Sequence, residues 1–193
     1  LGHFGVQTTS FITILGSAGV AIGLSLQGSL SNFAGGILIL ILKPFVVGDY
    51  VSVCGCEGTV AVISLFYTTL HTVDNRNVVL PNGSLSNSNI TNYSANEIRR
   101  VDMSVDVGYG SDLKKAREVI MDILNQDERI LKDPAPIVAV DNLGDSGVNV
   151  LIRPWVKCED YWAVKWSVLE TVHNRLNAEQ IDIPFPQMTV HLD

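Results

Sequence analysis

The first part of the chain is one long apolar stretch without formal charge. Residues 4–42 contain no Asp, Glu, Lys or Arg, so every charged side chain falls within residues 43–193. A helix of ~22 residues over positions 6–27 would extend ~33 Å, which matches the ~30 Å hydrocarbon core of a bilayer. The pattern predicts a membrane-spanning helix there, joined at Gly28 to a second, interfacial helix over residues 29–42.

The pattern changes after Pro44, which ends the second helix because proline cannot continue the helical hydrogen-bond ladder. Short alternations of apolar and polar positions, separated by turn residues, predict a small β-barrel-like domain that ends near Ser94. Its strands are expected within residues 49–55, 58–74 and 77–83. Asp74-Asn75 is expected to form a hairpin turn.

A third region alternates strands with two helices. We expect a strand within residues 99–109, a helix over 111–124, strands within 136–156 and a helix over 160–181. Ser111 or Asp112 is expected to cap the first of these helices. This β-α-β-β-α order is ferredoxin-like, with the helices on one face of the sheet. Residues 184–193 form a short expected strand without an evident partner in its own domain.

Small residues divide the membrane-spanning helix into distinct faces. Glycine costs about 1 kcal/mol against alanine in a helix interior, so the four glycines among residues 16–28 indicate a close neighbour. On a wheel at about 100° per residue, one small face holds Ser17, Ala21 and Ser25, and another holds Gly16, Gly19 and Gly23. Between them runs a stripe of Val6, Thr13, Val20 and Leu24, and the opposite side holds Phe11, Leu15, Ile22 and Leu26.

Two different small faces let each helix contact two identical neighbours, the glycine face of one copy against the serine and alanine face of the next. Such a heterologous contact closes into a ring, with Val20 and Leu24 facing the axis and Thr13 and Gln27 completing the lining. A ring of apolar side chains around a narrow lumen can gate by dewetting. The pattern favours a pore; the alternative is an ordinary helix of a polytopic bundle, where small residues simply ease packing.

Charge and candidate chemistry exclude several function classes. A net charge of −7 argues against nucleic acid as the main partner, since phosphate binding needs a basic face. The odd set of Cys54, Cys56 and Cys158 indicates a reducing compartment without a disulfide framework, and it lacks zinc-site spacing. We expect no metal and no cofactor. We also expect no enzyme, because His3, His71, His173 and His191 are scattered and no nucleophile lies in a G-x-S-x-G elbow.

A membrane-anchored oligomeric scaffold, or a ligand-binding module without conductance, is a second hypothesis. Its candidate binding face is the aromatic cluster of Trp155, Tyr161, Trp162 and Trp166. At helical spacing such a cluster is more typical of a core or of a subunit interface.

Several motifs occur in one order along the chain: “LQGSLSN”, “PF..GD.V”, “G.V” at Gly58-Val60, “LPNG”, “NYS”, “DERILKDP” and “PFPQM.V”. With residues 16–51, they resemble the family of the mechanosensitive channel of small conductance. The resemblance covers essentially the whole chain, from the pore-lining third transmembrane helix to the C-terminus. Because Leu1 is not a methionine and the two preceding helices of the family are absent, we expect a piece of a longer, multi-pass protein.

The resemblance implies a membrane protein of mixed α and β structure that assembles as a homoheptameric ring. The implied domains are a pore helix with a kinked interfacial helix (1–43), a small Sm/SH3-like β-domain (44–95), a ferredoxin-like α/β domain (96–184) and a C-terminal barrel strand (185–193). Val20 and Leu24 match the two constriction rings. Gly16, Gly19, Ala21 and Gly23 match the packing residues, and Gly28 matches the kink.

The function implied is a channel opened by membrane tension, which releases ions and small osmolytes during hypo-osmotic shock. Its location would be the bacterial inner membrane, with the residues after about 43 in the cytoplasm. Its partners would be further copies of itself, membrane lipids and the permeating ions and solutes.

Some positions depart from the family pattern. Val20 stands where leucine is usual, and Val46 where a basic residue would be unsurprising. Ser17 and Ser25 replace alanines on a packing face, and their hydroxyls are expected to hydrogen-bond to the backbone of a neighbouring copy and to shift gating. Asn32, an unpaired polar residue of the apolar interfacial helix, is expected to contact the β-domain at residues 81–83, with Gly83 as its partner.

Overall fold

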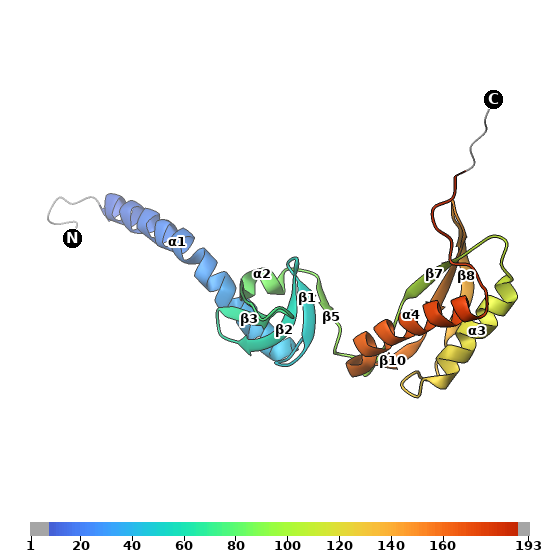
Figure 1. Ribbon diagram of the computed structural model, residues 1–193. Helices are drawn as coiled ribbons and strands as arrows, with labels where there is room; N and C mark the ends of the chain where they lie inside the picture. Colours follow the sequence, from blue (N-terminus) through green and yellow to red (C-terminus); the bar gives the residue numbers. More distant parts are fainter. Residues whose placement is uncertain (1–7, 189–193) are drawn as a thin grey trace, which may run out of the picture. The chain divides into compact units, whose positions relative to one another are not determined.

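The computed structural model describes residues 8–188 and divides into two compact units between Ala95 and Asn96 (Figure 1). The first unit contains helix α1 (Thr8–Leu42), five strands and the short helix α2 (Asn82–Ser86). The second contains the remaining strands with helices α3 (Leu113–Gln126) and α4 (Tyr161–Ala178). Each unit has its own hydrophobic core.

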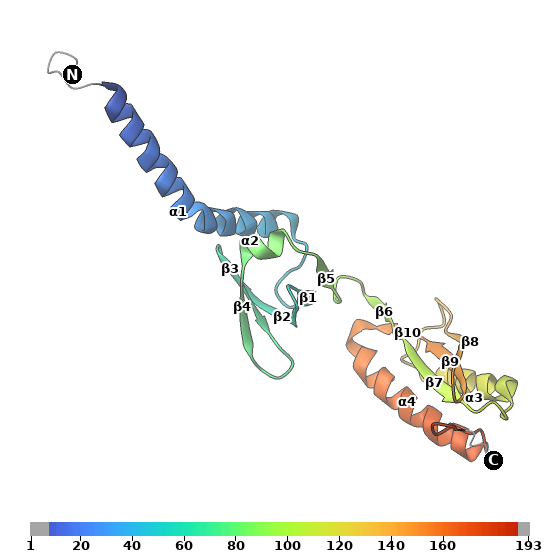
Figure 2. The ribbon, with the colours of Figure 1, turned by 90° about the horizontal axis from the view of Figure 1, so that it is seen from above.

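Helix α1 is one unbroken helix of 35 residues, where the sequence predicted two helices joined at Gly28. Glycine weakens a helix but keeps its backbone N–H, so the hydrogen-bond ladder can continue through it. Figure 2 shows that the axis of α1 changes direction along its length. The helix ends where Lys43, in the left-handed region at φ 47°, donates its backbone N–H to the Ile39 carbonyl at 2.9 Å.

The strands of the first unit form one antiparallel sheet with the order β4-β3-β2-β1-β5. They are β1 (Tyr50–Val53), β2 (Cys56–Ile63), β3 (Tyr67–His71), β4 (Asn77–Pro81) and β5 (Ile90–Asn92). The hairpin turn predicted at Asp74-Asn75 is confirmed, with Asn75 at φ 62° between β3 and β4. The sequence missed α2, because “PNG” was included in a strand and the chain instead turns into a helix at Asn82.

The core of this sheet includes residues from outside its strands. Three of them are Ile39 of α1, Phe45 of the turn after α1, and Leu85 of α2. They are buried together with the inward side chains of β1, β2 and β3. Ile39 and Phe45 each expose only 2% of their surface. The end of α1 is therefore part of the β-domain core, and burial of such large side chains contributes about 1.5–3 kcal/mol each.

The second unit packs α3 and α4 against a three-stranded sheet of order β7-β9-β8. Its strands are β7 (Met103–Val107), β8 (Ile137–Leu143) and β9 (Val148–Arg153), followed by β10 (Trp155–Lys157) and the 3-10 turn η2 (Cys158–Asp160). Alternate residues of β9 are buried under the helices. Asp112 caps α3, accepting the backbone N–H groups of Lys114 and Lys115, as predicted for one of two candidates.

Two expectations in this unit differ from the structure. The single strand expected over residues 99–109 is two strands, because β6 (Ile98–Arg100) pairs with β10 whereas β7 pairs with β9. The described part of the expected C-terminal strand, residues 184–188, has no regular structure, since a strand needs a pairing partner. Residues 189–193 lie outside the described part of the chain.

Candidate functional site

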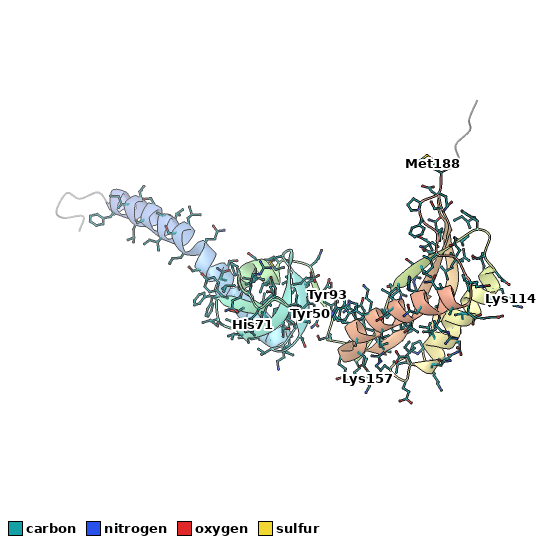
Figure 3. All side chains as sticks on the ribbon, in the orientation of Figure 1. Tyr50, His71, Tyr93, Lys114, Lys157 and Met188 are labelled. Atoms are coloured by element: carbon teal, nitrogen blue, oxygen red, sulfur yellow. The ribbon has the colours of Figure 1, made fainter. Side chains whose placement is uncertain are left out.

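The first half of α1 is exposed on every side. All described side chains from Phe11 to Leu30 are exposed, although the helix over Phe11–Leu42 is apolar and long enough to cross a membrane (Figure 3). Removing apolar surface from water is favourable by about 25 cal/mol per Å² of accessible area, so such surface is normally buried. This half of the helix therefore needs an apolar environment outside its own chain.

The glycine face of this half has open space around it in the described part of the chain. A Cβ added at Gly16, Gly19, Gly23 or Gly28 would meet no described atom within 4 Å. In α1 glycine reduces helix stability, and the described chain shows no contact that requires it. A second helix packed closely on this face would explain these residues.

The serine and alanine face is equally exposed, but its hydroxyls are used locally. Ser17 Oγ donates to the Ile14 carbonyl at 2.9 Å, and Ser25 Oγ donates to the Ala21 carbonyl at 2.8 Å. In the single chain both hydroxyls donate within α1, and a hydrogen bond to the backbone of a neighbouring copy stays a prediction. A serine hydroxyl in a helix readily donates a hydrogen bond to a carbonyl of the preceding turn. The serine side chains therefore stay close to the helix backbone, and this face of α1 remains narrow.

Val20 and Leu24 lie between these two faces, because α1 is helical throughout. They are 64% and 67% exposed. Thr13 and Gln27 belong to the same stripe and are also exposed, as are Phe11, Leu15, Ile22 and Leu26 on the bulky side. The structure keeps the arrangement of the wheel; what each face contacts remains a prediction. The role of Gly28 as the hinge of the bend is likewise a prediction.

The second half of α1 is packed closely on the β-domain through two adjacent glycines. Gly35 and Gly36 are buried, and a Cβ at Gly35 would overlap the carbonyl oxygen of Asn82. A Cβ at Gly36 would overlap the carbonyl oxygen of Leu65 and lie 2.7 Å from Asn82 Nδ2. Only glycine allows backbones to approach so closely. Figure 2 shows this part of α1 beside α2.

Asn82 is the polar centre of this contact. Its side chain is fully buried, and its Oδ1 accepts the Thr68 hydroxyl at 2.8 Å while its Nδ2 donates to the Ser64 carbonyl at 2.8 Å. Buried polar groups are costly unless paired, and these bonds join the start of α2 to strand β3 and to the loop that precedes it. Asn82 thus fixes both backbone segments on which Gly35 and Gly36 rest.

Asn32 forms the last contact of this set. The backbone N–H of Gly83 donates to Asn32 Oδ1 at 3.0 Å, at the unsatisfied N-terminus of α2. A Cβ at Gly83 would lie 2.7 Å from Ser31 Oγ, so this glycine also permits the approach. The structure thus brings together Asn32 and Gly83, the two residues paired in the sequence analysis.

We call Asn32, Gly35, Gly36, Asn82 and Gly83, with Thr68, the clamp. Sequence reasoning found Asn32 and Gly83 and included Asn82 in the contacted segment 81–83, but it assigned no role to Gly35, Gly36 or Thr68. The signal available was the Gly35-Gly36 pair in an apolar helix, since two adjacent glycines weaken a helix by about 2 kcal/mol relative to alanine.

The aromatic cluster is only partly a surface feature. Tyr161 is 9% exposed beneath the Arg99 guanidinium, 3.8 Å from its ring centre, and Trp155 is half-buried. Trp162 and Trp166 remain 50% and 65% exposed, with ring centres 5.7 Å apart. The structure therefore reduces the candidate binding face to two tryptophans of α4.

Candidate metal ligands are not gathered in the described part of the chain. No group of three or more His, Cys, Asp or Glu residues there could hold a metal ion. His71 and His173 are exposed in different units, and His3 and His191 lie outside the described residues. Cys54 and Cys56 are free thiols, and Cys158 Sγ donates to the Asn96 carbonyl at 2.9 Å.

One ionic cluster of the second unit is linked by several hydrogen bonds from Arg129. Arg129 donates two hydrogen bonds to the Asp127 carboxylate, at 2.8 and 2.6 Å, and one to Ser167 Oγ of α4 at 2.8 Å. The hydrogen bond from Arg129 holds the pKa of the Asp127 carboxyl below its usual value. The cluster joins the end of α3 to α4.

These features define a class of protein. It has a helix long and apolar enough to cross a membrane. The first half of this helix is exposed and the second half is packed on a β-domain through the clamp. Two family models match the chain, “Mechanosensitive ion channel, beta-domain” over residues 28–95 and “Mechanosensitive ion channel MscS, C-terminal” over residues 101–183.

Relatives match along the whole chain. An uncharacterized MscS family protein of Synechocystis is 43% identical over 192 residues, covering 100% of this chain and 65% of that protein. The small-conductance mechanosensitive channel of Helicobacter pylori is 40% identical over 191 residues, covering 98% of this chain and 70% of that protein. The chain thus spans about two thirds of the length of these relatives.

Solved structures agree. The crystal structure of Helicobacter pylori MscS in its closed state has a TM-score of 0.93 at 40% identity, covering 98% of this chain and 75% of that one. Arabidopsis thaliana MSL1 shares the fold, with a TM-score of 0.79 at 22% identity. The chain belongs to the MscS family of mechanosensitive channels.

Proposed function

We propose that copies of this chain assemble into a ring around a pore that membrane tension opens. The observation that carries this proposal is the exposure of both small faces of α1, with no described contact at Gly16, Gly19 or Gly23. A ring satisfies both faces at once, the glycine face against the face of Ser17, Ala21 and Ser25 of the next copy. Val20 and Leu24 would then surround the axis.

The gate follows from the chemistry of this lining. A narrow ring of Val20 and Leu24 expels water and blocks ions without a physical plug. Tension favours the state that occupies more membrane area, so α1 helices that tilt along their small faces would widen the ring until it wets. Gly28 would absorb the change of direction, since the clamp holds the second half of α1 on the β-domain.

Assembly and location follow from the family. We propose a homoheptamer in the bacterial inner membrane, with residues after about 43 in the cytoplasm forming a cage of Sm/SH3-like and ferredoxin-like domains. The C-terminal residues 185–193 would pair with those of other copies in a sevenfold barrel, a role compatible with a strand that has no partner in its own chain. Ions and small osmolytes would leave through the pore during hypo-osmotic shock.

A scaffold without conductance is the second candidate. The observation in its favour is the exposed pair of Trp162 and Trp166 on α4. Ligand-dependent quenching of tryptophan fluorescence, in a protein that shows no conductance, would favour it.

Patch-clamp recording of the full-length protein in liposomes under stepped suction tests the proposal. Leu24→Ser makes the constriction easier to wet, so the channel should open at lower tension. Leu26→Ser is the matched control on the bulky side and should leave the lining unchanged. If neither the wild type nor Leu24→Ser conducts, the scaffold becomes the better hypothesis. If both variants open at the wild-type tension, the gate lies elsewhere.

A further inference from the structure

The chain leaves α1 through a short turn that exposes apolar side chains. We call residues 43–48 the exit turn. Val46 and Val47 expose 46% and 58% of their surfaces. Ile41 and Leu42, which precede them by a few residues on the other side of Lys43, expose 70% and 71%. Scattered surface valines need no explanation, but here four exposed apolar residues lie within seven positions at the end of the membrane helix and just after it.

The exposure of Val46 and Val47 is imposed by the structure around them. Phe45, between them and Pro44, is buried in the β-domain core, which directs the neighbouring residues outward. The backbone N–H of Val46 donates to Asp49 Oδ2 at 2.9 Å, and the N–H of Gly48 donates to the Val60 carbonyl at 2.8 Å.

A second anchor comes from β5. Asn92 Nδ2 donates to Asp49 Oδ2 at 2.8 Å and to the Pro44 carbonyl at 3.3 Å. These bonds tie the turn to the sheet at both ends and occupy the Asp49 carboxylate. The exit turn is therefore a fixed element that holds two valines outside the core.

Charge and continuity identify the environment that suits this surface. Within the described residues 8–48, Lys43 carries the only formal charge, and a lysine with apolar neighbours is typical of the boundary between acyl chains and anionic headgroups. The face of α1 that carries Ile39 lies in the β-domain core, whereas Leu38, Ile41 and Leu42 remain exposed. Exposed apolar side chains thus lie on both sides of Lys43, at the end of α1 and in the exit turn.

We infer that the exit turn is a second membrane contact, in which Val46 and Val47 insert at the lipid interface and Lys43 lies among the headgroups. The β-domain is then held against the bilayer by its own surface as well as by α1. This goes beyond the proposed gate and requires only that α1 lies in the membrane.

Spin-label accessibility in the reconstituted full-length protein tests the inference. A nitroxide at Val47→Cys is compared with one at Val73→Cys, in a background with Cys54, Cys56 and Cys158 changed to serine. Val73 is the matched control, an 86% exposed valine of the turn between β3 and β4, at the hairpin end opposite α2. A third label at Leu26→Cys reports whether α1 itself is in lipid.

Collision with oxygen, which concentrates in lipid, is measured against collision with a water-soluble nickel chelate in phosphatidylglycerol-containing vesicles. We expect the oxygen-to-nickel ratio at position 47 to exceed that at position 73 severalfold. A ratio equal to that at position 73 would place the turn in water and overturn the inference. Low accessibility to both reagents would also overturn it, because another copy or another segment would then cover the turn. A high oxygen-to-nickel ratio at position 26 with a low ratio at position 47 refutes this inference alone. A low ratio at both positions shows that α1 itself does not lie in the membrane, which refutes the proposed function as well.

Discussion

Gly19 and Gly36 belong to the same helix and have opposite surroundings. A methyl group added to Gly19 would meet no described atom, whereas one added to Gly36 would overlap the Leu65 carbonyl oxygen. In the first half of α1 small residues remain available for contacts outside the chain. In the second half they are already used, inside the clamp. Residue type alone therefore says that a close neighbour exists, and only the surroundings say whether it lies in the same chain.

The same contrast leads us to expect different behaviour from the two halves of α1 in the proposed channel. Contacts between copies can be exchanged when a ring widens, but the clamp has no slack, because buried backbones already touch at Gly35 and Gly36. We expect the first half of α1 to change its neighbours during gating and the second half to keep them.

The largest effect should come from cross-linking the two small faces. Gly19→Cys combined with Ala21→Cys in one chain, with the native cysteines changed to serine, should give a ladder of disulfide-linked oligomers after oxidation in membranes. The two positions lie on different faces of one helix, so a bond between them must join two copies. Non-reducing electrophoresis reads the result, and seven rungs are expected.

Ile22→Cys combined with Leu26→Cys is the control on the bulky side and should give no ladder. A product that stops at the dimer would contradict the ring, because it indicates a symmetric contact.

The next effect is that of Gly36→Ala. The added methyl group must displace either the Leu65 backbone or the Asn82 side chain, and overpacking of this kind costs about 1–3 kcal/mol. We expect faster amide hydrogen exchange in α2, measured by mass spectrometry. Gly19→Ala should leave the exchange of α2 unchanged. Equal amide exchange of α2 in the Gly36→Ala and Gly19→Ala variants would show that the contact at Gly36 can accommodate a methyl group.

A smaller effect is expected for Asn32→Ala. It removes the acceptor for the Gly83 N–H, a loss of about 1 kcal/mol. If the clamp transmits the state of the cytoplasmic unit to the gate, closure and desensitisation under sustained suction should change. Asn32→Asp keeps an acceptor at the same place and should behave more like the wild type. Unchanged closure and desensitisation in Asn32→Ala would remove the proposed role.

The smallest effect concerns pH and distinguishes the clamp from the second unit. Arg129 lowers the pKa of Asp127 in the folded state, so the stabilisation from this pair is complete above the unfolded pKa of about 3.9 and is lost as pH falls through the folded value. Hydrogen-exchange protection at the end of α3 should fall in this acidic range, and Asp127→Asn should flatten the dependence. The hydrogen-bonding side chains of the clamp, Asn32, Asn82 and Thr68, do not titrate there, so its protection should change less once intrinsic exchange is corrected.

Much of the fold could be predicted because its signals are local. The wheel of α1, the turn at Asn75 and the cap at Asp112 each depend on residues a few positions apart. The clamp could be predicted only in part. Asn32 was paired with Gly83 from the sequence, but the close approaches of Gly35 to Asn82 and of Gly36 to Leu65 join distant segments that no short pattern brings together. The division of residues 99–109 into β6 and β7 depends in the same way on which strands lie beside them.

By itself the sequence determined that the chain has an uncharged helix with two small faces, a stripe of Val20 and Leu24 between them, and two folded regions after Pro44. Periodicity and composition are properties of the chain before it folds. The tertiary structure alone decided that α1 continues unbroken through Gly28, that Gly35 and Gly36 are occupied while Gly16 and Gly19 are not, and that Val46 and Val47 face outward. These outcomes depend on which distant backbones approach, because a glycine or a valine carries no local signal of its partner.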